Sequence, residues 1–381
     1  MKKIAVIGKG TAGSQTILFL QKNAPSELEW YFDPLTPVQT VGEGATLILP
    51  LNLSAHMGFR YEDLPKINGT IKLGILKENW GLKNKKYFHH FQNPSVSYHF
   101  NAVKLQEHIF SYLENKVKII DKAVSPEKID ADFIYDCSGS PNNMTAYYES
   151  DLIPVNSAFV TQCYWKNPTF NYTLSIARPY GWVFGIPLTN RCSIGYLYNS
   201  AINSISEIKE DVKNLFTEYN LDPSDDTNHL SFNNYYRKTN FSKRVAYNGN
   251  ASFFLEPLEA TSIQTIDYIQ RLYFNYIFNN ASLEDINNHY SVYMKEIETM
   301  IMMHYYANSP FDTKFWQEAN KKGMNTIHQA LDTDHNFQKI IKTANLDIDI
   351  NLCRTLPISY GTWCAGSWKE NLQGLGILLE K

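Results

Sequence analysis

The sequence predicts an α/β fold that combines a layer of parallel strands, an antiparallel β-sheet and a helical C-terminal region. Three observations support this prediction. A short apolar strand near the N-terminus leads through glycines into a helix pattern. Residues 155–198 are rich in aromatic and β-branched residues and are broken by turn signals, and after residue 261 the apolar residues recur at helical spacing. We expect a core over residues 1–280 that carries both sheets, and a mainly helical subdomain over 281–381.

The individual elements follow from continuous apolar runs, which are typical of buried parallel strands, and from helical periodicity. Strands are expected at 2–7, 28–32, 117–121 and 131–136, and helices at 11–23 and 101–115. Residues 34–47 form a loop rich in glycine, proline and threonine. The helical part is expected to comprise residues 263–277, 283–307 and 312–345.

The composition excludes several classes of protein. Hydrophobic residues make up 44% of the 381 residues, which suffices for a sizeable core. The formal net charge is only −3, which argues against nucleic acid as a partner. The sequence contains no apolar run of 18 residues, so we expect no membrane span. The five cysteines include no CxxC pair, so we expect reduced thiols in a cytoplasmic protein, with neither a disulfide framework nor a zinc site. The sequence does not determine the oligomeric state, and a homo-oligomer is one of the states that it allows.

The segment Gly8-Lys-Gly-Thr-Ala-Gly13 follows the first strand and opens the first helix. In this context the glycines of a GxGxxG motif permit a tight turn and a close approach of pyrophosphate, which then faces the helix N-terminus. Asp33 stands at the end of the second strand, where a carboxylate accepts hydrogen bonds from ribose hydroxyls. The sequence therefore predicts a dinucleotide site.

Further segments, in chain order, carry a resemblance to a known family. They are Val41-Gly-Glu-Gly-Ala-Thr46, Asn68-Gly-Thr-Ile-Lys72, Asp136-Cys-Ser-Gly139, Gly181-Trp-Val-Phe-Gly-Ile-Pro187, Phe254-Leu-Glu-Pro-Leu-Glu-Ala-Thr-Ser-Ile263, and His304-Tyr-Tyr with Asp312-Thr-Lys-Phe-Trp316. Together with the glycine motif they resemble the flavin-dependent halogenases, best known as tryptophan halogenases. The resemblance implies FAD, used as FADH2, in a fold of the glutathione-reductase type. It places the helical subdomain over the substrate site.

By this resemblance a set of residues binds FAD: Gly8, Gly10, Thr11, Ala12, Gly13, Asp33, Gly42, Glu43, Ala45, Asp136, Gly139, Leu255 and Pro257. Because no second GxGxxG opens a βαβ unit, we expect a separate flavin reductase to supply FADH2. O2 is then a co-substrate, and a halide ion is the group that is oxidised to hypohalous acid.

The resemblance assigns catalysis to Lys72 and Glu259. Spacing alone favours a solvated lysine on the polar face of a strand, and an acidic residue that favours a helix N-terminus. In the family this lysine meets hypohalous acid, either as a hydrogen-bond donor or as a haloamine. The paired glutamate polarises the electrophile or takes the proton from the ring intermediate.

Thr261 and Ser262 are expected to cap the helix that starts near residue 263, and by resemblance a halide binds at the same helix start. Trp182 and Phe184 alternate on a strand, which core packing alone explains. In the family they form a wall that keeps the organic substrate away from the flavin. His89 and Phe91 match a His-x-Phe segment that stacks on the aromatic substrate, and we expect no metal at His89 and His90.

The sequence departs from the family pattern at Phe184, at Ala260 and at Ser262, which stand in place of Trp, Ser and Gly. The chain is also short in the helical part, which predicts a more open site for an electron-rich aromatic ring than one for free tryptophan. The resulting prediction is a halogenase that guides hypohalous acid to Lys72 and Glu259. The alternatives are an FAD-dependent monooxygenase that hydroxylates its substrate, and a non-catalytic flavin-binding protein.

Overall fold

The computed structural model describes residues 1–36, 42–91 and 95–379. The chain divides into two compact units, each built from three segments. The first unit contains Met1–Gly69, Tyr98–Glu149 and Tyr235–Val292, and the second contains Thr70–Ser97, Ser150–Asn234 and Tyr293–Lys381. The predicted division at residue 280 stays a prediction. The chain does pass there from α5 (Thr261–Phe278) to α6 (Leu283–Ala307).

The first unit is built on a five-stranded parallel sheet, β16-β8-β1-β2-β7. Its strands are β1 (Lys2–Ile7), β2 (Ser26–Phe32), β7 (Lys118–Asp121), β8 (Phe133–Asp136) and β16 (Val245–Tyr247). The central position of β1 explains its apolar run, since Ile4, Ala5 and Val6 have no exposed surface. The four predicted strands of this layer are confirmed, each to within two residues at either end.

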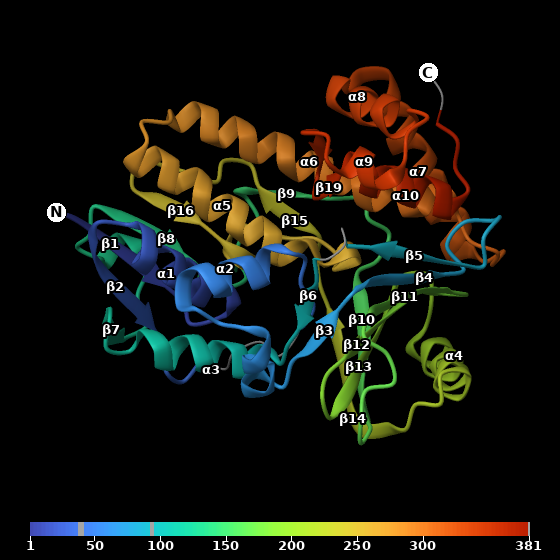
Figure 1. Cartoon of the computed structure of the whole chain (residues 1–381), viewed down its shortest axis with the longest axis horizontal. Coiled ribbons are helices and arrows are strands. Elements are labelled where there is room, and N and C mark those ends of the chain that lie inside the picture. The colour runs from blue at the N-terminus through green and yellow to red at the C-terminus, as the bar shows by residue number, and fades with distance from the viewer. Residues whose placement is uncertain (37–41, 92–94, 380–381) are drawn as a thin grey trace. The chain divides into compact units, whose positions relative to one another are not determined.

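Helices pack on this sheet, among them α1 (Thr11–Asn23), which contacts β1, β2 and β8 as well as α3 and α5 (Figure 1). The other helical elements are α2 (Ile48–Met57), α3 (Ala102–Leu113) and α5, with the 3₁₀ turns Tyr61–Ile67, Pro126–Lys128, Gly249–Ala251 and Leu258–Ala260. A small antiparallel sheet, β17-β15-β9, joins Phe253–Phe254, Tyr235–Arg237 and Tyr147–Glu149. The chain passes between the units at β3 (Thr70–Lys72) and β6 (Ser97–His99).

The second unit contains a seven-stranded sheet in the order β14-β10-β13-β12-β11-β4-β5, which is antiparallel except where β4 pairs with β11. Its strands are β4 (Gly74–Glu78), β5 (Lys86–His90), β10 (Ser157–Tyr164), β11 (Thr173–Arg178), β12 (Gly181–Pro187), β13 (Arg191–Tyr198) and β14 (Pro223–Ser231). The predicted antiparallel sheet is therefore confirmed. β14 was not predicted, because its sequence PSDDTNHLS shows no apolar alternation.

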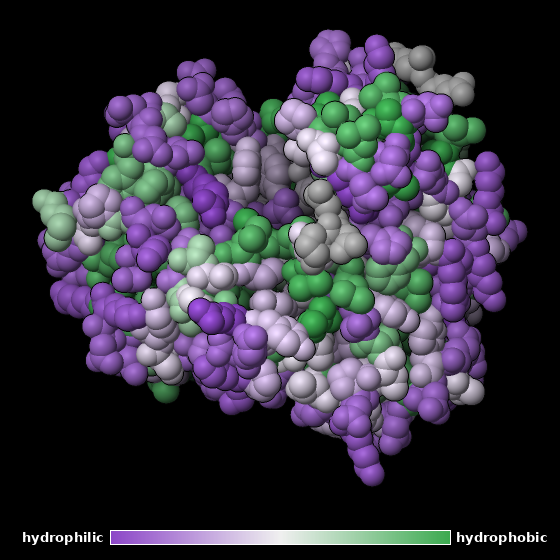
Figure 2. Space-filling view, viewed as in Figure 1, coloured by the Kyte–Doolittle hydropathy of each residue, from purple (hydrophilic) through white to green (hydrophobic). Residues whose placement is uncertain are grey.

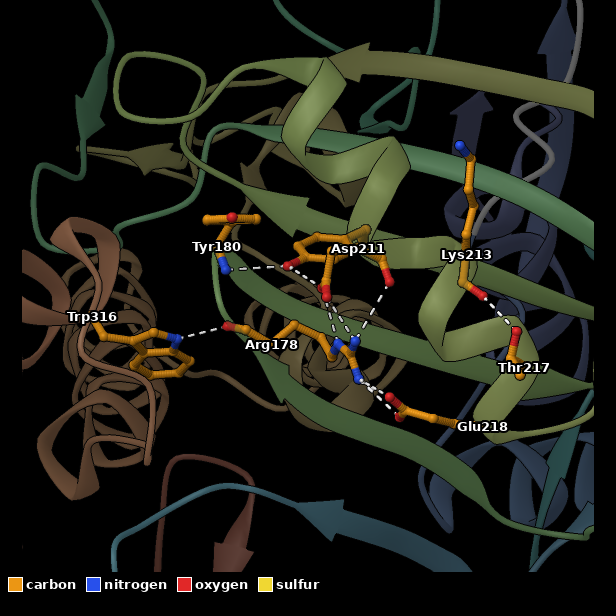
Figure 3. A network of polar contacts seen from close by, with 8 residues as sticks. Arg178, Tyr180, Asp211, Lys213, Thr217, Glu218 and Trp316 are labelled. Atoms are coloured by element: carbon orange, nitrogen blue, oxygen red, sulfur yellow. Dashed lines mark hydrogen bonds and ion pairs between the residues drawn. The ribbon is translucent and has the colours of Figure 1, made fainter.

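One face of this sheet is covered by α4 (Ile205–Glu218), whose Ile208, Val212 and Leu215 join its apolar core (Figure 1). A polar network also fixes α4 (Figure 3). Arg178, at the end of β11, donates through Nε and Nη2 to Asp211 at 2.9 and 2.7 Å, and through Nη1 to Glu218 at 2.9 Å. Burial alone would lower the pKa of Arg178, but its hydrogen bonds and charge interaction with Asp211 raise it above the usual value.

The C-terminal part of the second unit is mainly helical. It contains α6 from Tyr293 onward, α7 (Lys314–Thr333), α8 (His335–Ala344), α9 (Ile350–Arg354) and α10 (Ala365–Leu375), with the short strands Ser359–Tyr360 and Trp363–Cys364. The predicted helix over 283–307 is confirmed. The stretch 312–345 divides into α7 and α8 at Asp334, whose carboxylate accepts the N–H groups of Asn336 and Phe337 and so starts a new helix.

The surface view in Figure 2 shows apolar residues gathered over the C-terminal helices, where Leu346 and Leu352 are exposed. No helix in the described ranges has the length and hydropathy needed to cross a bilayer. All five cysteines are free thiols. Across residues 1–36, 42–91 and 95–379, no group of three or more His, Cys, Asp or Glu side chains is arranged to hold a metal ion.

Candidate functional site

The glycine turn after β1 has the geometry that its sequence predicts. Gly8 has φ +101°, and a Cβ on it would lie 2.2 Å from the carbonyl oxygen of Cys137. A Cβ on Gly13 would lie 2.0 Å from the carbonyl oxygen of Gly8, so both positions require glycine for packing within the chain. Gly10 differs, because a Cβ there would meet no atom of residues 1–36, 42–91 and 95–379 within 4 Å. Gly10 therefore borders open space beside the start of α1.

This open space suits a dinucleotide. Thr11, Ala12 and Gly13 form the first turn of α1, so their N–H groups have no partner inside the helix and favour an anion. Asp33, directly after β2, accepts hydrogen bonds from Leu35 N and Thr36 Oγ1, both at 2.9 Å. A carboxylate has about four acceptor positions, so Asp33 retains capacity for ribose hydroxyls. The residues of this turn fit the phosphates and ribose of FAD.

The loop 42–47 is held against the start of α3. Glu43 is 2% exposed and its Oε1 accepts the N–H of Ala102 at 3.4 Å, while its carbonyl oxygen accepts the N–H of Phe100 at 3.0 Å. Ala45 is fully buried and donates its N–H to Tyr98 at 3.3 Å. Gly42 has φ +86°, and a Cβ on it would meet no atom of the described residues within 4 Å. Val41, the first residue of the matched segment, lies outside the described residues.

Asp136 and Gly139 lie at the end of β8. Burial raises the pKa of Asp136, although hydrogen bonds from the hydroxyl and the N–H of Ser138 partly offset this effect. Gly139 has φ +108°, and a Cβ on it would meet no atom within 4 Å in the part of the chain that the structure describes. The strand end thus combines a buried carboxyl group with a glycine that leaves room at the carboxyl edge of the sheet, where ligands of such sheets bind.

The segment before α5 contains two consecutive residues in the left-handed region. Glu259 has φ 68° and ψ 9°, and Ala260 has φ 54° and ψ 40°. Outside glycine this conformation costs about 1–2 kcal/mol per residue, and such strain concentrates at functional sites. Glu259 is 5% exposed, and Glu256 and Leu255 are also buried, beside a half-buried Pro257. The segment therefore holds two buried carboxyl groups on a strained turn.

The predicted caps of α5 are wrong. The helix begins at Thr261, and the residue before it, Ala260, has no capping side chain. Thr261 and Ser262 are instead the first two helical residues, because the left-handed turn at Glu259 and Ala260 brings the chain into the helix earlier than the periodicity indicates. Thr261 is buried and Ser262 is exposed. Their N–H groups belong to the helix's first turn, which is where a helix accommodates an anion.

Lys72 ends β3 in the second unit, and its side chain has no exposed surface. A solvated lysine on a polar face, which spacing alone favoured, is therefore excluded. The strand is anchored two residues earlier, where Thr70 Oγ1 donates to the carbonyl oxygen of Pro187 at 2.6 Å. Lys72 Nζ lies 5.7 Å from the centre of the Phe91 ring, within reach of a cation–π interaction. Lys72 and the predicted substrate residue Phe91 are thus neighbours.

Trp182 and Phe184 lie on the same face of β12, because alternate residues of a strand point the same way. Their ring centres are 6.3 Å apart. Trp182 is buried against Trp80, and the half-buried Phe184 lies over Gly195, where a Cβ would come within 2.1 Å of the ring. Trp182 and Phe184 are thus neighbouring aromatic rings that pack against core residues of the second unit.

His89 on β5 is 8% exposed, and its ring centre lies 5.4 Å from that of Trp363. The end of β5 is hydrogen-bonded to α10, because the Glu370 carboxylate accepts the N–H of His90 at 2.9 Å. The same carboxylate accepts a hydrogen bond from Arg354 Nη2 of α9 at 2.6 Å. His89 is therefore an internal residue of the second unit, and the strand that carries it is held in place by a C-terminal helix.

Sequence reasoning missed one buried polar pair. Lys77 on β4 and His304 on α6 are both fully buried, and their Nζ and Nε2 atoms are 2.7 Å apart. Trp363 links this pair to His89, because its ring centre also lies 5.4 Å from that of His304. The available signal was Lys77 itself, a lysine that directly follows the apolar residues Ile75 and Leu76 in β4.

Comparisons with known proteins show which family the chain resembles in sequence. The profile of the family described as tryptophan halogenase matches residues 3–124 and 114–378. A tryptophan 6-halogenase from Streptomyces albogriseolus is 25% identical over 274 residues, which cover 66% of this chain and 49% of that protein. A tryptophan 7-halogenase from Lentzea aerocolonigenes is 30% identical over 211 residues, which cover 51% of this chain and 38% of that protein. The matches thus span half or less of these two curated relatives.

The fold is also that of solved structures. A tryptophan halogenase from Shewanella frigidimarina superposes with a TM-score of 0.80 at 19% identity, covering all of this chain and 90% of that one. A flavin-dependent halogenase from Brevundimonas sp. BAL3 gives 0.78 at 20% identity, covering 99% and 90%. Because the family profile matches most of the chain in sequence and these structures share its fold, the chain belongs to the tryptophan halogenase family.

Proposed function

We propose that this chain is a flavin-dependent halogenase that uses reduced FAD, O2 and a halide to halogenate an electron-rich aromatic ring. The observation that carries the proposal is Lys72, a lysine with no exposed surface that lies beside the Phe91 ring. Burying an amine is costly, so a fold retains one where a partner or a reaction requires it. Family membership supports halogenation as that reaction.

When bound, FAD would supply the oxidising chemistry, which turns halide and O2 into hypohalous acid. Lys72 would donate a hydrogen bond to the oxygen of hypohalous acid and so make its halogen more electrophilic. As the carbon–halogen bond forms and the halogen–oxygen bond breaks, the departing oxygen takes a proton from the Lys72 ammonium and leaves as water. Glu259 would accept the proton that the ring loses. The burial of both side chains supports this proposal, since it limits competition from water.

The halide would bind at the N–H groups of Thr261 and Ser262, at the first turn of α5. Trp182 and Phe184 would keep the organic substrate away from the flavin, which distinguishes halogenation from direct hydroxylation. His89 and Phe91 would contact the aromatic ring of the substrate. We further propose indoles or phenols as substrates, and a separate flavin reductase as the partner that supplies FADH2.

A reconstituted assay tests the proposal. The protein is supplied with FAD, a flavin reductase, NADH, O2 and chloride, bromide or iodide in turn, with a panel of phenols and indoles. Mass spectrometry then measures incorporation of halogen and of oxygen. We expect a halogenated product that depends on halide. Hydroxylated product formed without halide would instead establish a monooxygenase, and flavin turnover with no modified product would establish a non-catalytic flavoprotein.

The role of Lys72 is tested by Lys72→Ala, which we expect to abolish halogenation while flavin oxidation continues. Lys86→Ala is a matched control on β5, because the Lys86 side chain is half exposed; its Nζ pairs with Glu78 at 3.0 Å and lies 5.8 Å from the centre of the Tyr219 ring. The control should retain halogenation. Wild-type product yield in Lys72→Ala would remove Lys72 from the mechanism.

A further inference from the structure

Lys77 lies on the same face of the seven-stranded sheet as two of the predicted substrate residues. Residues that pair directly across neighbouring strands point to one face, and so do alternate residues of a strand. His89 on β5 pairs with Ile75, two residues before Lys77 on β4. Lys77 pairs with Ser175 on β11, which pairs in turn with Phe184 on β12. The strand register therefore places Lys77, His89 and Phe184 on one face.

The other face of the sheet is the one that α4 covers. Ile176 and Val183, on β11 and β12, pack with Val212 of α4 in the apolar core. Arg178 is two residues after Ile176 on β11 and points the same way, and it donates to Asp211 of α4 at 2.7 Å (Figure 3). Each face of the sheet thus carries a buried polar pair of its own.

Aromatic rings connect His304, the partner of Lys77, with predicted substrate residues. The Trp363 ring contacts both His304 and His89, and the ring centres are 5.4 Å apart in each case. The Trp80 ring contacts His304 at 5.4 Å, and its centre lies 6.3 Å from that of Trp182 on β12. A displacement of the His304 ring therefore changes the packing of the rings against both His89 and Trp182.

We infer that the contact between Lys77 and His304 positions His89 and Trp182 for the aromatic substrate. The inference rests on the function proposed above, in which both of these side chains border the substrate. Lys77 and His304 are fully buried, and their Nζ and Nε2 atoms are 2.7 Å apart. Replacing a buried polar pair by apolar residues of similar volume is often neutral for stability. A hydrogen bond differs from apolar packing because it has a direction, so this pair fixes the orientation of the His304 ring. Lys77 and His304 are thus positioning residues that act through their aromatic neighbours.

The ratio of product isomers tests this role. Lower stability reduces the amount of active protein, but it does not change the ratio that each active molecule produces. The assay uses bromide and the ring from the phenol and indole panel whose wild-type ratio differs most from that given by free hypobromous acid. Lys77→Met and His304→Leu should move the ratio toward that of the free acid. They should also lower kcat/KM for the ring about tenfold, as expected when a substrate is misplaced, while flavin oxidation continues.

Two further variants serve as controls. Asp211→Asn weakens the buried pair on the face that α4 covers, so it should lower the Tm and leave the isomer ratio unchanged. His304→Gln keeps an acceptor for the Lys77 amine and should restore most of the wild-type ratio. If an apolar variant does not fold, Lys77→Gln repeats the test, because its shorter side chain leaves Nε2 of His304 out of reach.

The outcomes separate the inference from the function on which it rests. An unchanged isomer ratio in the Lys77 and His304→Leu variants overturns the inference, and so does an equal shift in Asp211→Asn. A wild-type ratio equal to that of free hypobromous acid for every ring also overturns it, since no ring is then positioned. Wild-type protein that incorporates no halogen into any ring overturns the proposed function instead.

Discussion

Lys77 and His304 lie 2.7 Å apart in the second unit, and the arrangement fixes which of them donates the proton. His304 Nδ1 is 3.2 Å from the carbonyl oxygen of Met300, and a carbonyl oxygen only accepts. Nδ1 therefore carries the proton, and Nε2 is the acceptor for the amine of Lys77. The Trp80 ring packs against both groups, with its centre 5.4 Å from the His304 ring and 5.7 Å from Nζ.

Replacing either member of this pair should destabilise the protein. We expect Lys77→Met and His304→Leu each to lower the free energy of unfolding by about 2 kcal/mol, because each leaves the other buried group with one bond fewer. The double variant should be more stable than the sum predicts, by about 1–3 kcal/mol. Urea denaturation followed by tryptophan fluorescence measures the cycle. Strict additivity would show that the two side chains are not coupled.

The two glycines of the turn after β1 should behave differently. In Gly13→Ala the new methyl group meets the carbonyl oxygen of Gly8 at 2.0 Å, so the flavin-free protein should be destabilised. In Gly10→Ala the methyl group meets no atom of the described residues within 4 Å, so the flavin-free Tm should be retained while affinity for FAD falls. Thermal denaturation with and without FAD distinguishes the two. Normal FAD affinity in Gly10→Ala would mean that the cofactor does not approach the backbone here.

The left-handed conformation of Ala260 predicts that Ala260→Gly stabilises the protein. Glycine removes a strain of about 1 kcal/mol, and the greater freedom of the unfolded chain offsets part of that gain. We expect a small increase in Tm, measured by thermal denaturation. Ala319→Gly, in the interior of α7, is the control and should lower the Tm, since glycine costs about 1 kcal/mol in a helix. A loss of stability in Ala260→Gly as large as in the control would contradict the strain.

Asp136 predicts a dependence of stability on pH. Burial raises its pKa above the ordinary value of 3.8, so the folded state binds this proton more tightly than the unfolded state does. The stability that Asp136 contributes is therefore present below pH 3.8 and is lost as the pH rises through the raised value. Asp136→Asn should gain stability relative to wild type as the pH increases from about 4 to 7, measured as the difference in Tm.

Asp63 supplies the opposite control for this measurement. Its pKa is lowered, chiefly by a hydrogen bond from Lys66 and then by one from the N–H of Arg60, so its contribution is present at neutral pH. Asp63→Asn should therefore be less stable than wild type by a nearly constant amount from about pH 4 to 7, and the difference should shrink as the pH falls below 3.8. A pH-independent difference for Asp136→Asn would show that its carboxyl group titrates normally.

The parallel layer was predictable from the sequence because burial on both faces leaves continuous apolar runs, as in β1. The glycine turn was predictable because Gly8 and Gly13 are required by contacts within the chain itself. The edge strand β14 was not predictable, since it is mostly exposed and polar. The start of α5 was misplaced because the left-handed turn at Glu259 and Ala260 has no glycine to mark it.

The burial of individual polar side chains was the property that could least be predicted from the sequence. From spacing, Lys72 resembles any lysine on the polar face of a strand, and only the structure shows that it has no exposed surface. Lys77 and His304 are 227 residues apart in the chain, so no local pattern indicates their contact. These features depend on contacts between distant segments, which local patterns do not encode.

The hydrogen bond from the N–H of His90 to Glu370 also affects how the chain folds while it is being synthesised. The two residues are 280 positions apart, so this hydrogen bond between β5 and α10 can form only after Glu370 has left the ribosome. Until then one edge of the seven-stranded sheet is open to other chains. Nascent chains stalled before α10 should therefore be prone to aggregation and should depend on chaperones.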